Sequence, residues 1–147
     1  MKGKKKEWTE LTDADRLMFD RFKDWYNLKC EGRFMYEDAE FQSFKNDNGI
    51  ILDNESPIPK KQMEANKIFY DSKRSAVGDL ARHIRNAYSH SQIKRVDGYY
   101  IMTDLRPKNK NRPAQVTMRG KISIELMQGL LDAIRKNKCN RSQKVSK

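Results

Sequence analysis

The sequence is poor in cysteine and histidine, with two of each among its 147 residues. Cys30 and Cys139 stand far apart, so they predict no disulfide framework, and two free thiols in a reducing compartment are the simpler interpretation. This favours the cytoplasm. His83 and His90 have no cysteine nearby, and no Cys/His cluster has zinc spacing. We therefore expect neither a metal nor another cofactor.

Long apolar runs are missing as well, and none approaches the roughly 20 residues that a transmembrane helix needs. The basic segment Met1–Lys6 is not followed by an apolar stretch, so it does not have the pattern of a signal peptide. Internal repeats and low-complexity core segments are also absent. These observations exclude a membrane-spanning protein and a repeat protein from the expected classes.

Acidic residues are few relative to basic ones: 20 Asp and Glu stand against 31 Lys and Arg, a formal net charge of +11. Such an excess favours a polyanionic partner, nucleic acid before an acidic membrane surface. A solubilising role for the charge is the alternative. The length fits one domain with a core of its own. We place this domain at residues 12–136, between basic tails at residues 1–11 and 137–147.

Apolar residues recur at helical spacing in four segments. They predict helices over Asp13–Lys29, with Thr12 as its N-cap, over Tyr36–Lys45, over about Lys61–Ser89, and from Ser123 to about Lys136. In the third segment, seven residues form one apolar stripe: Ala76, Val77, Leu80, Ala81, Ile84, Ala87 and Tyr88.

The pattern changes to period two at Tyr99–Leu105, and Ala114–Met118 is suited to be its partner strand. The basic, turn-rich segment Pro107–Pro113 lies between them, so the pair predicts a β-hairpin. Helices followed by a hairpin and a last helix do not favour a parallel βαβ sheet. We expect a mainly α fold, a helical bundle with the hairpin between its longest and its C-terminal helix.

Both histidines fall in residues 82–91 of the longest predicted helix. On an ideal helix His83, Asn86 and His90 share one face, with Asp79 and Arg82 beside them, opposite the apolar stripe. We therefore expect these polar groups to point towards solvent or a partner. An ordinary solvated helix face, without chemistry, is the alternative interpretation.

The residue types in this segment suit metal-free cleavage of RNA. The 2′-hydroxyl can attack the adjacent phosphorus if one group takes its proton and another protonates the leaving 5′-oxygen, and histidine suits both tasks near neutral pH. A guanidinium such as that of Arg85 can bind the charge that gathers on the phosphoryl oxygens. Asn86 can orient a phosphate or an imidazole, and His90 completes the set.

The string Arg85-Asn86-Ala87-Tyr88-Ser89-His90 resembles the motif of HEPN domains, an arginine and a histidine separated by four to six residues, with a polar residue after the arginine. The longer string from Leu80 to Ser91 looks especially like the plasmid-borne HEPN group. The resemblance covers roughly residues 60–136. It implies a helical bundle, dimerisation that brings two motifs together, and metal-independent endoribonuclease activity in toxins and antiviral effectors.

Carried over by residue, the resemblance implies that Arg85 and His90 are catalytic and that Asn86 supports them. A homodimer joined through the motif helices would bring two copies of His90 to one phosphate. Arg85 and His90 lie about 140° apart on a straight helix and do not share a face. His83 is open to three interpretations: a second proton-transfer group, a bystander, or a contact to RNA, which we favour.

Other basic residues are candidates for RNA contacts: Arg82 on the motif helix, Lys94 and Arg95 just after it, and the positive loop Lys108–Arg112. Ordinary solvated charge is the alternative for each. The expected function is an endoribonuclease that leaves 2′,3′-cyclic phosphate and 5′-hydroxyl ends and is held in check by an antitoxin protein or a regulatory RNA. A non-catalytic RNA-binding module is the main alternative, and an adaptor without RNA contact explains the charge poorly.

Overall fold

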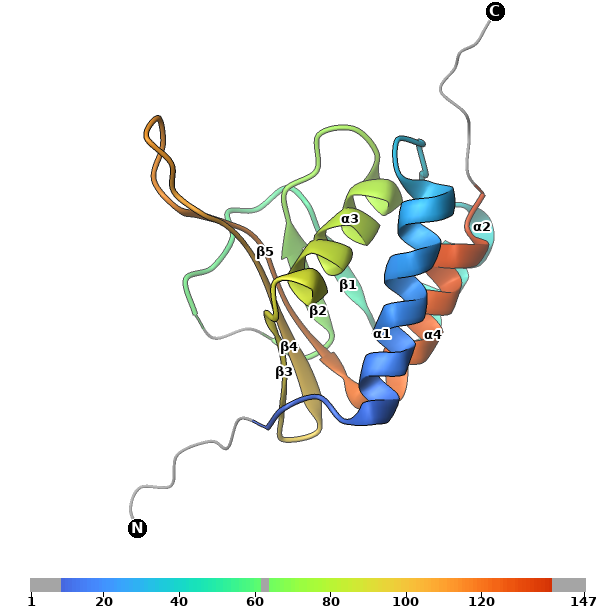
Figure 1. Ribbon diagram of the computed structural model, residues 1–147. Helices are drawn as coiled ribbons and strands as arrows, with labels where there is room; N and C mark the ends of the chain where they lie inside the picture. Colours follow the sequence, from blue (N-terminus) through green and yellow to red (C-terminus); the bar gives the residue numbers. More distant parts are fainter. Residues whose placement is uncertain (1–8, 62–63, 139–147) are drawn as a thin grey trace, which may run out of the picture.

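The computed structural model describes residues 9–61 and 64–138, which form four α-helices and one five-stranded sheet (Figure 1). In chain order, the elements are α1 (Asp13–Trp25), a π-helical turn η1 (Tyr26–Cys30), α2 (Ala39–Asp47), β1 (Ile51–Asp53), β2 (Lys67–Tyr70), α3 (Ala76–Ser89), β3 (Ile93–Val96), β4 (Tyr99–Arg106), β5 (Gln115–Ser123) and α4 (Ile124–Lys136). The fold is α+β, so the prediction of a mainly α bundle is wrong.

The sheet has the strand order β1-β2-β5-β4-β3, with β1 and β2 parallel and every other pair antiparallel. Its helical cover lies on one side, where α1, α3 and α4 are found (Figure 1). The predicted hairpin is confirmed as β4 and β5, but it forms the middle of a sheet rather than an appendage to a bundle. The other three strands extend the sheet on both sides of it.

The helix predicted from Lys61 begins only at Ala76, because part of that segment is strand β2. Ile68 and Tyr70 are buried and alternate with the half-buried Lys67 and Phe69. This period of two is only four residues long, and such a short run does not distinguish a strand from a helix. Its pairing with β5, about 50 residues later, decides the conformation.

Several local predictions are confirmed. Thr12 caps α1: its hydroxyl accepts a hydrogen bond from the Asp15 amide at 3.0 Å, and the Asp15 carboxylate accepts one from the Thr12 amide at 2.9 Å. The first predicted helix spans α1 and then η1. Ser123 occupies the N-cap position of α4, although its side chain makes no capping hydrogen bond. The second predicted helix is α2, which begins three residues later than expected.

The apolar stripe of α3 is confirmed, and it carries much of the core. Five of its residues are fully buried: Val77, Leu80, Ala81, Ile84 and Ala87. Gly78 lets the start of the helix approach the chain after η1, since an added Cβ would lie 3.3 Å from the Arg33 carbonyl oxygen. The amides of Val77 and Gly78 both donate to the Met35 carbonyl. Helix α3 is therefore held at its N-terminus as well as along its length.

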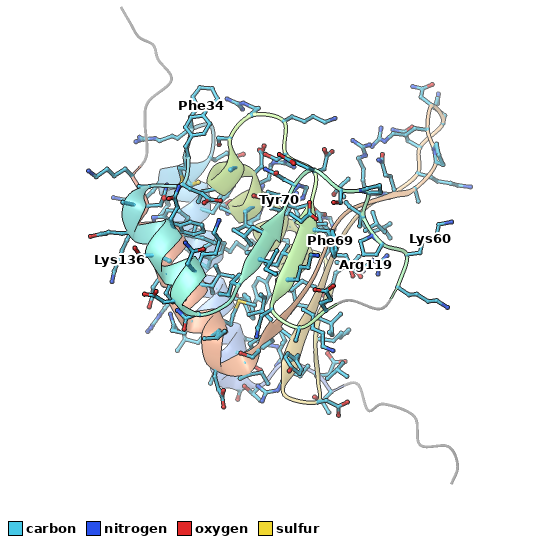
Figure 2. All side chains as sticks on the ribbon, turned by 180° about the vertical axis from the view of Figure 1, so that it is seen from behind. Phe34, Lys60, Phe69, Tyr70, Arg119 and Lys136 are labelled. Carbon is cyan, nitrogen blue, oxygen red and sulfur yellow. The ribbon has the colours of Figure 1, made fainter. Side chains whose placement is uncertain are left out.

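The opposite face of the sheet carries polar and aromatic side chains. Phe69 of β2 and Arg119 of β5 are neighbours across the two strands (Figure 2).

The predicted tails fall largely outside the described residues. Of the parts that are described, Thr9 pairs with Arg95 through backbone hydrogen bonds, and buried Asn137 donates to the Tyr36 carbonyl at 2.7 Å.

We expect Leu80→Ala to lower the free energy of unfolding by about 2–5 kcal/mol, because it leaves a cavity under a side chain that is 0% exposed. Leu28→Ala is the matched control: Leu28 is 80% exposed, and its truncation should change stability by less than about 0.5 kcal/mol. Urea unfolding of both variants measures the difference. Equal losses would contradict the assignment of the α3 stripe to the core.

Candidate functional site

A cavity of about 300 Å³ opens between the C-terminal half of α3, the segment after β2 and the end of β4. Four residues of the 82–91 segment line it: Arg82, His83, Asn86 and His90. The segments that face them contribute charged side chains: Asp71, Lys73, Asp104 and Arg106. The cavity therefore combines an imidazole, cations and carboxylates from parts of the chain that are far apart in sequence.

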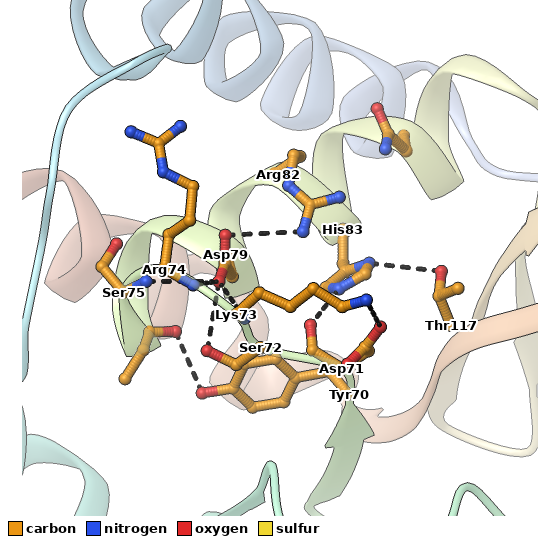
Figure 3. Close-up of polar contacts among 12 residues, drawn as sticks. Tyr70, Asp71, Ser72, Lys73, Arg74, Ser75, Asp79, Arg82, His83 and Thr117 are labelled. Atoms are coloured by element: carbon orange, nitrogen blue, oxygen red, sulfur yellow. Dashed lines mark hydrogen bonds and ion pairs between the residues drawn. The ribbon is translucent and has the colours of Figure 1, made fainter.

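His83 also borders the cavity, but it is only 1% exposed, so the expectation that its side chain faces solvent is wrong. Its Nδ1 lies 2.7 Å from the Asp104 carboxylate, and its Nε2 lies 2.7 Å from the Asp71 carbonyl oxygen. Figure 3 shows His83 reaching towards Asp71 and Thr117 below the helix. The residue therefore ties α3 to the ends of β2 and β4, beneath the cavity.

The hydrogen-bond partners of His83 restrict its protonation. A carbonyl oxygen only accepts, so Nε2 must carry a proton. An ionised carboxylate also only accepts, so either Nδ1 is protonated too or the proton between His83 and Asp104 lies on the carboxyl group. In both cases the two ring nitrogens are occupied. His83 is thus suited to positioning, and the geometry does not favour it as an RNA contact or a free proton-transfer group.

His90 is the accessible imidazole. It occupies the C-cap of α3, where its amide donates to the Asn86 carbonyl at 3.0 Å. Ser91 follows with φ at 60°, the left-handed conformation that ends a helix, and Gln92 then donates to the Ala87 carbonyl. The helix therefore stops at His90 and leaves its exposed side chain at the lip of the cavity.

Arg85 points to a different part of the molecule. Its guanidinium donates to the Asn27 side chain at 2.5 Å and lies over the ring of Tyr26, 4.6 Å from the ring centre. It is not among the residues that line the cavity, so the structure does not bring Arg85 and His90 together within one chain. This agrees with their angular separation on an ideal helix.

Asn86 connects the two regions. Its side-chain oxygen accepts from Arg85 Nε at 2.9 Å, and its amide nitrogen donates to the Asp104 carboxylate at 3.4 Å. Asn86 therefore helps to hold the arginine on one side and the carboxylate of the buried pair on the other. A supporting role fits this geometry better than direct contact with a reacting group.

The predicted basic contacts are divided between two regions. Arg82 lines the cavity, with its guanidinium 3.4 Å from Asp79. Lys94 lies outside the cavity, in a separate depression beside Tyr88 and Ser89, 3.6 Å from Glu10. Arg95 donates to the Asp15 carboxylate at 2.6 Å, on the helical side of the sheet. Of these three cations, Arg82 is the one placed beside His90.

A tight turn after β2 places Lys73 at the cavity. The Asp79 carboxylate accepts hydrogen bonds from the backbone amides of Lys73, Arg74 and Ser75 and from the Ser72 hydroxyl, at 2.8 to 3.2 Å (Figure 3). Burial alone would raise the pKa of Asp79, but these donors outweigh burial and hold the pKa below its ordinary value. The charge of Asp79 therefore organises the turn that carries Lys73.

Sequence reasoning missed four residues of this arrangement: Asp71, Lys73, Asp104 and Arg106. One signal was available for Asp104, which follows the buried Tyr100 and Met102 at the period of two of β4. A carboxylate at an inward strand position requires a buried partner. The other three lie in the turn after β2 and at the end of β4, which no periodicity reveals.

Within residues 9–61 and 64–138, no three acidic, cysteine or histidine side chains are grouped so that they could hold a metal ion. None of the helices described is both long enough and apolar enough to cross a bilayer. Comparison with protein-family models, curated proteins and solved structures found no match to the chain.

Asp79→Asn should lower the free energy of unfolding by about 1–3 kcal/mol at neutral pH, because a neutral amide weakens several charge-assisted hydrogen bonds. A carboxyl group whose pKa is lowered by folding stabilises the protein above its unfolded pKa and loses this contribution as the pH falls. The gap between wild type and variant should therefore shrink below about pH 4. Urea unfolding across pH tests this, with exposed Asp24→Asn as the control. A gap that persists undiminished in acid would contradict the assignment.

Proposed function

We propose that this protein is a metal-independent endoribonuclease that acts at the cavity beside His90. One observation carries the proposal: an accessible imidazole lies at the lip of a cavity that Lys73, Arg82 and Arg106 also line. Cations around an imidazole suit a phosphodiester, because they bind its oxygens while the imidazole moves a proton. The net charge of +11 adds a general attraction for RNA.

In the proposed reaction, His90 takes the proton of the 2′-hydroxyl, whose oxygen attacks the adjacent phosphorus. The bond from phosphorus to the 5′-oxygen breaks, and that oxygen leaves with a proton from a general acid. The products are a 2′,3′-cyclic phosphate and a 5′-hydroxyl. Arg82 and Arg106 are suited to the phosphoryl oxygens. Asn86, Asp104 and His83 act as positioning residues behind them.

A homodimer is part of the proposal, because a single His90 does not serve as base and acid in the same step. A two-fold axis beside the ends of the two α3 helices would supply the second imidazole. The resemblance of residues 85–90 to the HEPN motif supports both the dimer and the chemistry, although the bundle it implied is not the fold. A role as a cytoplasmic toxin or antiviral effector, restrained by an antitoxin protein or a regulatory RNA, follows from the same resemblance and is equally a proposal.

A second candidate function is RNA binding without cleavage. The observation that favours it is the state of the other two motif groups: both nitrogens of His83 are engaged, and Arg85 is bound by Asn27 and Asn86. One chain then offers a single free imidazole and three cavity cations, Lys73, Arg82 and Arg106, of which the first two lie 3.8 and 3.4 Å from Asp71 and Asp79. A module that holds a structured guide or regulatory RNA would need no more.

His90→Ala should reduce cleavage of end-labelled single-stranded RNA in EDTA by about 10²–10⁴-fold, the usual contribution of a general acid or base. Ser89→Ala is the control, since Ser89 is the exposed neighbour that lies outside the cavity. Analysis of the product ends identifies the cyclic phosphate. Unchanged cleavage by the His90 variant would refute the site. Tight RNA binding by the wild type without any cleavage would favour the binding module.

If the active form is a dimer, cleavage per chain should fall when the protein is diluted below its dimer dissociation constant. Sedimentation at the same concentrations measures the fraction of dimer. The two curves should coincide. Full activity per chain in samples that sediment as monomers would show that one chain is sufficient.

A further inference from the structure

The ends of β4 and β5 extend beyond the rest of the sheet as a hairpin that projects from the body of the protein (Figure 1). We call residues 105–115 the basic arm. Every residue in it is exposed. Its tip is ordered by Asn109, whose side-chain oxygen accepts from the amides of Asn111 and Arg112 at 2.8 and 3.0 Å. Two backbone hydrogen bonds between Asn109 and Arg112 close the same turn.

The basic arm carries positive charge without acidic compensation. Its four cations are Arg106, Lys108, Lys110 and Arg112, and residues 105–124 include neither Asp nor Glu. Arg106 donates to Gln115, a neutral partner, and none of the four forms an ion pair with an acidic residue in the described part of the chain. By contrast, Lys94 and Arg95 on β3 each face a carboxylate.

The base of the arm is also a wall of the cavity. The pairing of β4 with β5 shifts register between Asp104 and Leu105, next to Thr117. Such a bulge bends the strands and redirects the hairpin beyond it. Thr117 donates to the Asp104 carbonyl at 3.1 Å, and Leu105, Arg106 and Pro107 then line the cavity. Any chain held along the arm is therefore led to the place where His90 lies.

We propose that the basic arm binds the phosphate backbone of a single RNA strand and guides it into the His90 cavity. This inference rests on the proposed function and adds the surface that holds the substrate. Lysine at the tip provides point charges for phosphates, and the arm has no aromatic side chain on which a base could stack. Binding along it is therefore independent of base sequence. A single strand fits because in-line attack by the 2′-hydroxyl needs a backbone free to turn.

The test is a variant in which Gln replaces each of Lys108, Lys110 and Arg112. This variant also carries His90→Ala, so that binding is measured without cleavage. In the matched control, Gln replaces Arg21, Lys29 and Lys136 in the same His90→Ala protein. These are three exposed cations of the helical side, so the control loses the same charge. Affinity for a single-stranded RNA of about 16 nucleotides is measured against salt concentration. The slope of log affinity against log salt should become shallower by about 2 in the arm variant, at about 0.7 per lost phosphate contact on a single strand.

The control should keep the slope of the parent, and both variants should keep its unfolding midpoint, since all six side chains are exposed. Equal slopes for the arm variant and the control would overturn the inference and leave the proposed nuclease intact. A loss confined to duplex RNA would overturn the single-strand assignment. Failure of the nuclease appears separately, either as cleavage that does not depend on His90 or as RNA binding by the wild type without cleavage. With His90 present, the arm variant should raise KM for RNA more than it lowers kcat.

Discussion

The buried pair of His83 and Asp104 is the interaction on which the candidate site depends. It joins helix α3 to strand β4, and the second nitrogen of His83 joins the same helix to the end of β2 through the Asp71 carbonyl. Both side chains are nearly inaccessible to solvent. Removing one partner would leave the other buried without its hydrogen bond, which costs about 1–3 kcal/mol. The three walls of the cavity are therefore held together by one imidazole.

This arrangement separates the two histidines by role. His83 lies within the length of α3, and both nitrogens of its ring have hydrogen-bond partners. His90 lies at the C-cap, where the helix ends and its ring is open to solvent. The difference follows from the position of each residue relative to the sheet and not from its spacing along the helix. A polar face opposite an apolar stripe faces solvent only where no second element packs against it, and β4 packs against α3.

The cations of the basic arm differ in ion pairing from those of β3 and the cavity, and this difference supports the proposed direction of substrate entry. At β3, Lys94 and Arg95 are paired with carboxylates, and at the cavity the cations of Lys73 and Arg82 lie 3.8 and 3.4 Å from Asp71 and Asp79. Along the basic arm, Arg106 and the three cations of the tip form no ion pair with an acidic residue in the described part of the chain. Unpaired cations on an exposed, ordered hairpin hold a polyanion at little cost in desolvation. The bulge at Leu105 then places the arm and the cavity beside each other.

Several features could be predicted from the sequence because they depend on neighbours within a few residues. The Thr12 capping box, the stripe of α3, the β4–β5 hairpin and the helix α4 are of this kind, and so is the excess of positive charge. The angular separation of Arg85 and His90 also follows from helix geometry alone. The mainly α fold was wrong because β1, β2 and β3 are three or four residues long, and only pairing with distant strands makes such runs extended. The burial of His83 and the grouping of Lys73, Arg82, His90 and Arg106 around one cavity likewise depend on contacts across the sheet, which no local pattern encodes.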